Sequence, residues 1–176
     1  MRANTWPGWT FVGAVMTLAV LAVGCGDDAA SGTVGVTAVD YRFEDLPKEA
    51  EAGTVLTLIN ESTREIHELV AVKLPDSEKR SAAELVKLPQ DQLQGLFQGP
   101  PAMVLVAPPN KARQIEAEGD GTLRDRGRYL VACFTPTGAD PGAYVAAVAG
   151  GGEGPPDVAG GPPHTTQGMF GEIKVV

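Results

Sequence analysis

The stretch Gly127-Arg128-Tyr129-Leu130-Val131-Ala132-Cys133-Phe134 decides how the rest of this sequence is interpreted. Its β-branched, aromatic and aliphatic side chains predict a strand over residues 128–134. Because side chains alternate along a strand, Tyr129, Val131 and Cys133 lie on one face. Cys133 stands at the end of this strand, where a loop begins. The stretch therefore predicts a thiol at one end of a β-sheet.

Short β-rich runs, separated by turn residues, recur on both sides of this strand. They are residues 33–43, 54–60, 66–74, 103–107, 113–118 and 170–176. Short strands with regular Gly and Pro punctuation indicate an all-β domain with two packed sheets, a β-sandwich. We find no internal repeat.

Two stretches depart from the strand pattern. In residues 76–97, Ser81 and Glu84 form a capping box that precedes apolar residues, which predicts a short helical insertion covering an edge or end of the sandwich. In residues 136–163, Gly and Pro fill 14 of 28 positions. We expect no regular element there, only a Gly/Pro-rich loop.

The N-terminus has the pattern of a targeting segment. Arg2 supplies positive charge, and residues 11–23 form an uncharged, mostly apolar run. This pattern predicts a signal peptide over residues 1–24 and export from the cytoplasm. The run is short for a membrane span, which needs about 20 apolar residues. An uncleaved N-terminal anchor is the alternative.

The sequence Leu21-Ala22-Val23-Gly24-Cys25 resembles the cleavage motif of bacterial lipoproteins. The resemblance implies that Cys25 becomes the lipid-modified first residue of the mature chain. The protein would then be anchored to the cell membrane and face the extracytoplasmic side. Residues 25–32 are polar and small and predict a flexible tether, which leaves residues 33–176 as one domain.

The chain is acidic, with a formal net charge of −8. Nucleic-acid binding depends on basic patches that neutralise phosphates, so we expect no nucleic-acid partner. An acidic surface instead favours docking to a basic patch on a protein partner. We expect the protein itself to be a monomer.

Cys133 is the only cysteine of the predicted domain. Exported proteins usually pair their cysteines, so a lone one indicates a metal ligand, a reactive thiol or a buried inert residue. His164 and Met169 follow before the last strand, and His67, the only other histidine, opens the strand at 66–74. One thiolate, two imidazoles and a weak axial thioether form the ligand set of a type 1 copper site.

These residues resemble the cupredoxins, the plastocyanin- and azurin-like blue copper domains. The similarity is densest in the Gly-x-Tyr-x-x-x-Cys motif that ends at Cys133 and the His-x4-Met motif that begins at His164. It implies an antiparallel Greek-key β-sandwich, one copper ion held by His67, Cys133, His164 and Met169, and single-electron transfer with a redox partner protein. It also implies that Asn60 fixes the ligand loops by hydrogen bonds and that His164 is the exposed ligand through which the electron leaves.

One spacing departs from the family. Thirty residues separate Cys133 from His164, where cupredoxins usually have a few to about ten. A tenfold longer loop costs only about 2 kcal/mol of extra closure entropy. A tight metal site contributes on the order of 10 kcal/mol. The long loop is therefore expected to weaken the site without preventing it.

Several alternatives stay open at this stage. The same ligands suit extracytoplasmic copper storage or delivery, and the domain could also be an interaction module without metal.

Asp125, Gly127 and Tyr129 resemble the tyrosine corner of immunoglobulin domains, but there the cysteine follows the tyrosine after two residues and forms a disulfide with a second cysteine. Cys133 with a histidine could form a nucleophile pair. Since no histidine remains for a further copper centre, we expect that the protein is not an enzyme.

Overall fold

The computed structural model describes residues 29–97, 99–111, 113–151 and 154–176. The predicted signal peptide, the predicted lipidation site Cys25 and the first half of the predicted tether lie outside these ranges. The tether's last residues are within them, and Ala30 is already hydrogen-bonded to the backbone of Glu49 and Glu51. Ordered pairing therefore begins before residue 33.

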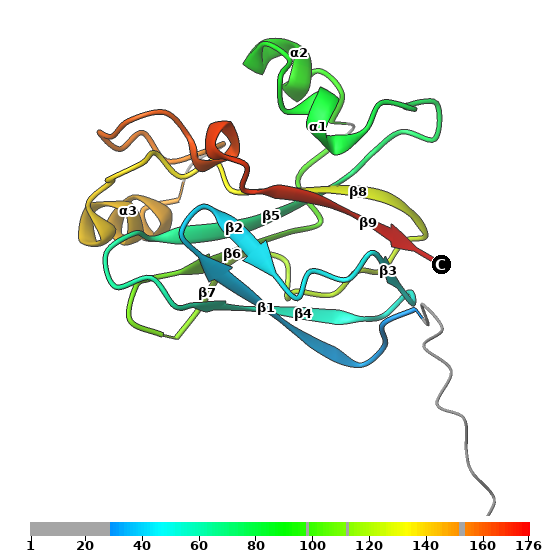
Figure 1. Cartoon of the computed structure of the whole chain (residues 1–176), viewed down its shortest axis with the longest axis horizontal. Coiled ribbons are helices and arrows are strands. Elements are labelled where there is room, and N and C mark those ends of the chain that lie inside the picture. The colour runs from blue at the N-terminus through cyan, green and yellow to red at the C-terminus, as the bar shows by residue number, and fades with distance from the viewer. Residues whose placement is uncertain (1–28, 98, 112, 152–153) are drawn as a thin grey trace, which may run out of the picture.

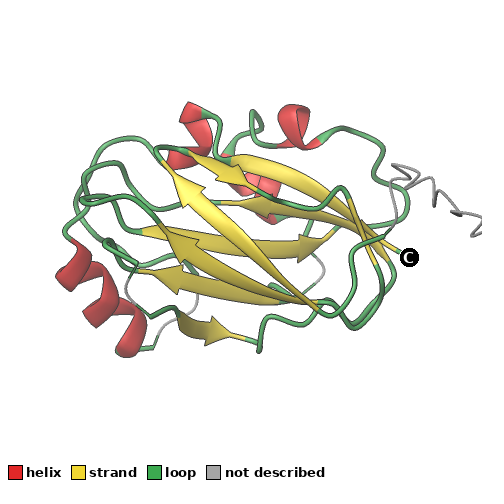
Figure 2. Ribbon diagram, turned by 60° about the horizontal axis from the view of Figure 1, so that its bottom comes forward, coloured by secondary structure: helices red, strands yellow, loops and turns green. Residues whose placement is uncertain are grey.

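Two sheets pack face to face (Figures 1 and 2). The smaller sheet has the order β2 (Arg42–Glu44), β1 (Thr33–Val39), β4 (Val55–Asn60). The larger has the order β3 (Glu49–Ala50), β9 (Phe170–Val175), β8 (Gly127–Ala132), β5 (His67–Lys73), β6 (Met103–Ala107), β7 (Ile115–Glu118). This confirms the predicted β-sandwich. Most strand pairs are antiparallel, while β1–β4 and β3–β9 run parallel.

The prediction of one strand over residues 33–43 was wrong. Asp40 and Tyr41 both have positive φ, 26° and 69°, and form a tight turn that divides the segment into β1 and β2. Asp40 is a residue type that favours turns, but tyrosine rarely takes this backbone conformation because its Cβ crowds the backbone, so a turn at Tyr41 is not indicated by the sequence. The turn matters below because it carries Tyr41 to the site.

The core lies between the sheets and is built from the alternating inward residues of both. It includes Val36, Leu56, Leu58, Leu69, Leu105, Tyr129, Val131, Cys133, Met169 and Ile173. The outer face of the larger sheet is also covered. The predicted helical insertion is present as α1 (Ala82–Leu85) and α2 (Gln90–Gln94), whose leucines pack with Leu130 and Ala132 of β8.

A third helix, α3 (Pro141–Ala149), lies within residues 136–163, where we expected no regular element. That expectation was wrong because Gly and Pro gather mainly outside the helix, whose interior is rich in Ala and Val. Asp140 caps it by accepting a hydrogen bond of 2.7 Å from the backbone N–H of Ala143, and Pro141 suits its first turn. In Figure 1, α3 lies at the left end of the sandwich.

Two further features of the fold bear on the sequence analysis. Among the described residues, no helix combines the length and apolar character needed to cross a membrane.

The Tyr129 hydroxyl donates a hydrogen bond of 2.8 Å to the carbonyl of Asp125. The tyrosine corner suggested by the sequence is therefore formed, within a sandwich whose described cysteine is free.

Gly121, in the turn before β8, lies in close contact with the backbone of β4. Its φ is +82°, and an added Cβ would lie 2.5 Å from the carbonyl oxygen of Leu56. Gly53 has φ +98° with no atom within 4 Å of such a Cβ. We expect Gly53→Ala to cost about 1 kcal/mol of unfolding free energy from backbone strain alone. Gly121→Ala should cost roughly 1–3 kcal/mol more because of the contact. Chemical denaturation of both variants measures the difference, and equal losses would contradict the contact.

Candidate metal centre

Three side chains that could bind a metal converge at one end of the sandwich. Nδ1 of His67 and Nδ1 of His164 are 3.1 Å apart, and Sγ of Cys133 is 3.3 Å from Nδ1 of His164. One ligand atom from each of the three residues lies within 4.8 Å of the other two. All three residues are completely buried.

The strand pairing accounts for two of these positions. β5 and β8 are antiparallel neighbours, with Val70 opposite Ala132. The first residue of β5 and the residue after β8 therefore meet at the same end of the sheet. These residues are His67 and Cys133, and both side chains point inward, between the sheets.

The return of His164 across the long insertion depends on backbone pairing. The N–H of Cys133 donates to the carbonyl of Met169 at 3.1 Å, and its carbonyl accepts from the N–H of Thr165 at 3.0 Å. The N–H of His164 donates to the carbonyl of Thr135 at 3.0 Å. The insertion is thus closed at its base, and its length does not separate the ligands. The expected weakening of metal binding by the long loop stays a prediction.

Met169 and Asn60, the other two predicted site residues, lie close by. Met169 is fully buried in the same core cluster as Cys133. The Asn60 amide donates to the carbonyls of Glu65 and Ala107, both at 2.8 Å, and its oxygen accepts from the N–H of Ser62. Asn60 therefore holds the segment that leads into His67 against β6.

His164 is not exposed, contrary to the expectation drawn from the family resemblance. Its side chain has no exposed area, and Tyr41 and Glu65 lie against its ring. The Tyr41 ring meets the imidazole edge-on with 4.9 Å between ring centroids. Glu65 Oε2 lies 3.4 Å from Nε2, without the geometry of a hydrogen bond. Tyr41 also donates to Glu65 Oε1 at 3.4 Å. The β1–β2 turn and the segment before β5 thus form a cover over His164.

Burial keeps the site uncharged while it holds no cation. It lowers the pKa of His67 to about 4, with a smaller contribution from neighbouring His164, and also lowers the pKa of His164. Burial raises the pKa of the Cys133 thiol to about 12, and the nearby Glu68 carboxylate adds to this effect. The thiol is therefore protonated at neutral pH, and a bound cation would favour the thiolate by compensating its charge.

The donor atoms suit a single metal ion. Metal bonds of about 2.0–2.3 Å at roughly tetrahedral angles separate ligand atoms by about 3.3–3.6 Å. The distances from Nδ1 of His164 to Nδ1 of His67 and to Sγ of Cys133 are within a few tenths of an ångström of this range. Nε2 of each histidine is buried without a hydrogen-bond partner among the described residues. The nitrogens that face each other are instead the Nδ1 atoms, on the side of Cys133.

Sequence reasoning missed three residues of this site. Tyr41 was placed within a strand, and Tyr144 lay in a segment expected to be irregular. Glu68 is the most informative omission, because it follows His67 directly and is almost completely buried. A carboxylate within an otherwise apolar strand was the available signal, since such groups are rarely buried without partners.

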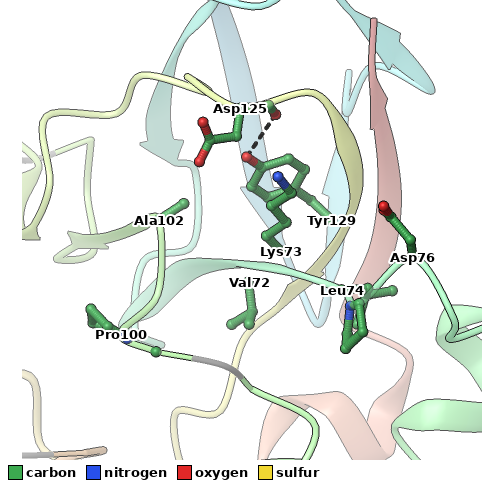
Figure 3. Close-up of a pocket in the computed structure, with 10 residues that line it drawn as sticks. Val72, Lys73, Leu74, Asp76, Pro100, Ala102, Asp125 and Tyr129 are labelled. Atoms are coloured by element: carbon green, nitrogen blue, oxygen red, sulfur yellow. Dashed lines mark hydrogen bonds between the residues drawn. The ribbon is translucent and has the colours of Figure 1, made fainter.

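The opposite end of the sandwich offers a different environment. A pocket of about 450 Å³ lies there, between the end of β5 and the start of β8. Figure 3 shows Lys73, Asp76, Asp125 and Tyr129 around it. Its lining contains no histidine or cysteine, and the chemistry described above is confined to the other end.

Neither a protein-family model nor a curated protein matches the chain. Solved structures that resemble it include dithionite-reduced auracyanin from the photosynthetic bacterium Roseiflexus castenholzii, with a TM-score of 0.47, 18% identity and coverage of 84% of this chain and 99% of that one. Auracyanin A, a "blue" copper protein from Chloroflexus aurantiacus, has a TM-score of 0.43 and 18% identity, with coverage of 84% of this chain and 100% of that one. Auracyanin B has a TM-score of 0.35 and 19% identity, with coverage of 85% of this chain and 91% of that one. At such low identities and TM-scores, a functional assignment depends on the site itself.

The lowered pKa of His67 predicts a pH dependence of stability for the metal-free chain. The unfolded histidine takes up its proton near pH 6.5, whereas the folded one does so near pH 4. Stability should therefore fall as the pH drops through this window, by about 3 kcal/mol at most from this residue. His67→Gln should make the fall shallower, and the buried His164, whose pKa is also lowered, should account for what remains. Urea unfolding at several pH values measures both curves, and identical slopes would contradict the burial effect.

Proposed function

We propose that the chain binds one copper ion through His67, Cys133 and His164, with Met169 as a weak axial ligand, and carries single electrons outside the cytoplasm. The observation that carries the proposal is the convergence of two Nδ1 atoms and one Sγ in a fully buried cluster. This donor set with a nearby thioether suits copper. Copper, when bound, supplies a one-electron couple. The protein holds the ligands in place and keeps water away from them.

The burial of the ligands supports a carrier rather than a copper-delivery protein. His67, Cys133 and His164 have no exposed area, so a partner's ligands cannot reach the metal position without opening the fold. An electron, in contrast, can pass through a covering side chain. We propose no catalytic role, because both histidines of the chain serve as ligands and none is left for a second metal or as a base.

The position of the site also fits a tethered protein. β1 begins at Thr33 near the far end of the sandwich and ends at Val39, beside the Tyr41 turn that covers His164. A lipid on Cys25 would therefore attach the chain at the end away from the site. The covered histidine would face outward, where a soluble redox protein could dock. The net charge of −8 favours a partner with a basic patch.

Copper addition provides the primary test. One equivalent of Cu(II) should give an intense visible thiolate-to-copper absorption band, and Cys133→Ser should abolish it because the thiolate is lost. The measurement is an absorption titration with the thiol confirmed to be reduced. Absence of the band in the unsubstituted chain, or colourless binding of zinc alone, would refute the blue-copper proposal.

The role of Met169 can be separated from its packing. Met169→Leu should keep the band and raise the reduction potential, because the loss of a thioether donor destabilises the oxidised metal. Met103→Leu is the matched control, since Met103 is also fully buried in the core but lies on β6. Voltammetry of both variants measures the shift. Equal potentials would exclude an axial role for Met169.

The cover over His164 predicts an effect on electron-exchange rates. Tyr41→Ala should make oxidation of the reduced protein by a small cationic cobalt complex several-fold faster, because the reagent can then approach the imidazole. Tyr41→Phe keeps the ring and should stay close to the unsubstituted rate. Stopped-flow absorption measures these rates. A slower reaction in Tyr41→Ala would instead identify the ring as the electron path.

A further inference from the structure

Glu68 is a buried carboxylate with both oxygens hydrogen-bonded. Only 3% of the residue is exposed. Oε1 accepts from the N–H of Phe134 at 2.9 Å, and Oε2 accepts from the hydroxyl of Tyr144 at 2.8 Å. The backbone N–H of Glu68 points at Sγ of Cys133, 3.4 Å away. Burying a carboxylate is costly unless its oxygens are hydrogen-bonded, and here the two bonds to Phe134 and Tyr144 offset that cost.

The register of the sheet explains why Glu68 can reach both the sulfur and its neighbour. β5 and β8 pair Val70 with Ala132, so Glu68 lies opposite Phe134. The regular ladder stops at this point, since the N–H of Glu68 faces the sulfur instead of a carbonyl. The Glu68 carboxylate takes over by accepting from Phe134. Two bonds from one residue therefore hold Cys133 and the backbone that follows it.

Tyr144 supplies the remaining partner of Glu68, and it comes from α3. Its side chain is buried against Ile66 and Val106, and only 1% of the residue is exposed. The helix belongs to residues 136–163, the insertion between Cys133 and His164. The insertion thus reaches across the outer face of the larger sheet and contacts the residue next to His67.

We propose that Tyr144 and Glu68 are positioning residues for the sulfur of Cys133, and that the insertion exists in part to supply Tyr144. The Tyr144 hydroxyl fixes the Glu68 carboxylate by a hydrogen bond. The fixed carboxylate in turn holds the backbone of Phe134 and supports the hydrogen bond from the backbone N–H of Glu68 to the sulfur. A hydrogen bond to a metal-bound thiolate withdraws electron density from it. The spectroscopic part of this proposal rests on the proposed copper site, whereas the positioning of the thiol does not.

The test compares two buried tyrosines in the full chain. Tyr144→Phe removes the hydroxyl bonded to Glu68. Tyr129→Phe removes a hydroxyl bond of the same length, 2.8 Å, at the opposite end of β8. Both variants should lower the urea midpoint similarly. Only Tyr144→Phe should shift the visible band and change the equilibrium constant for copper reduction, by about fivefold, as expected for one hydrogen bond.

A measurement without copper keeps the two proposals distinguishable. In the metal-free chain, a disulfide reagent should modify Cys133 several-fold faster in Tyr144→Phe than in Tyr129→Phe, because the sulfur is held less firmly. If the unsubstituted chain gives no blue band but this difference is found, the copper proposal fails and the positioning proposal stands. Equal modification rates, or equal band positions and potentials, would overturn the positioning role.

Glu68→Gln provides a second variant should Tyr144→Phe fold poorly. Glutamine has nearly the same volume but no charge and only one acceptor oxygen, so it can accept from the Phe134 N–H or from the Tyr144 hydroxyl but not from both. The band and the thiol reactivity should both change relative to Tyr129→Phe. Unchanged values in a folded Glu68→Gln protein would overturn the role assigned to Glu68.

Discussion

Backbone pairing at Cys133 is the interaction on which the site depends. Its N–H and carbonyl are bonded to Met169 and Thr165, so the strand end and the final segment of the chain form one unit. These bonds bring His164 to the sulfur whatever lies between them. The closure entropy of the insertion is therefore met by main-chain bonds, and a bound metal does not have to supply it. The insertion is free to contribute a helix.

Charge is the second constraint. The centre holds two imidazoles and a thiol with no exposed area, and burial disfavours every charged form of these groups. A neutral cage avoids the cost of buried charge, and a cation that binds there would replace the thiol proton. Glu68 lies just behind this cage, where burial also raises the pKa of its carboxyl. The proposed copper site thus lies in surroundings of low polarity, where burial disfavours charged side chains.

The two insertions give the larger sheet an unusual second covering. α1 and α2 pack over β8 and β9, while α3 packs near β6 and β7. The outward residues of the central strand β5 are buried, and Glu68, Val70 and Val72 line a pocket of about 1240 Å³ between the two insertions. Glu68 forms its bond network at the edge of this pocket. The fold thereby turns a solvent-facing position into part of the site's support. The Tyr41 turn completes the enclosure on the His164 side.

The sequence alone determined the sandwich, since alternation and turn residues mark most strands, and it determined the ligand candidates, since only one cysteine and two histidines exist in the predicted domain. It could not determine that α3 forms, because the helix is stabilised by a cap at Asp140 despite the flanking glycines. It could not determine the turn at Tyr41, because packing of the ring on His164 compensates the strain of a positive φ. Only the tertiary structure decided that His164 is buried. Exposure depends on what distant segments cover, and neither Tyr41 nor Glu65 is near His164 in the chain.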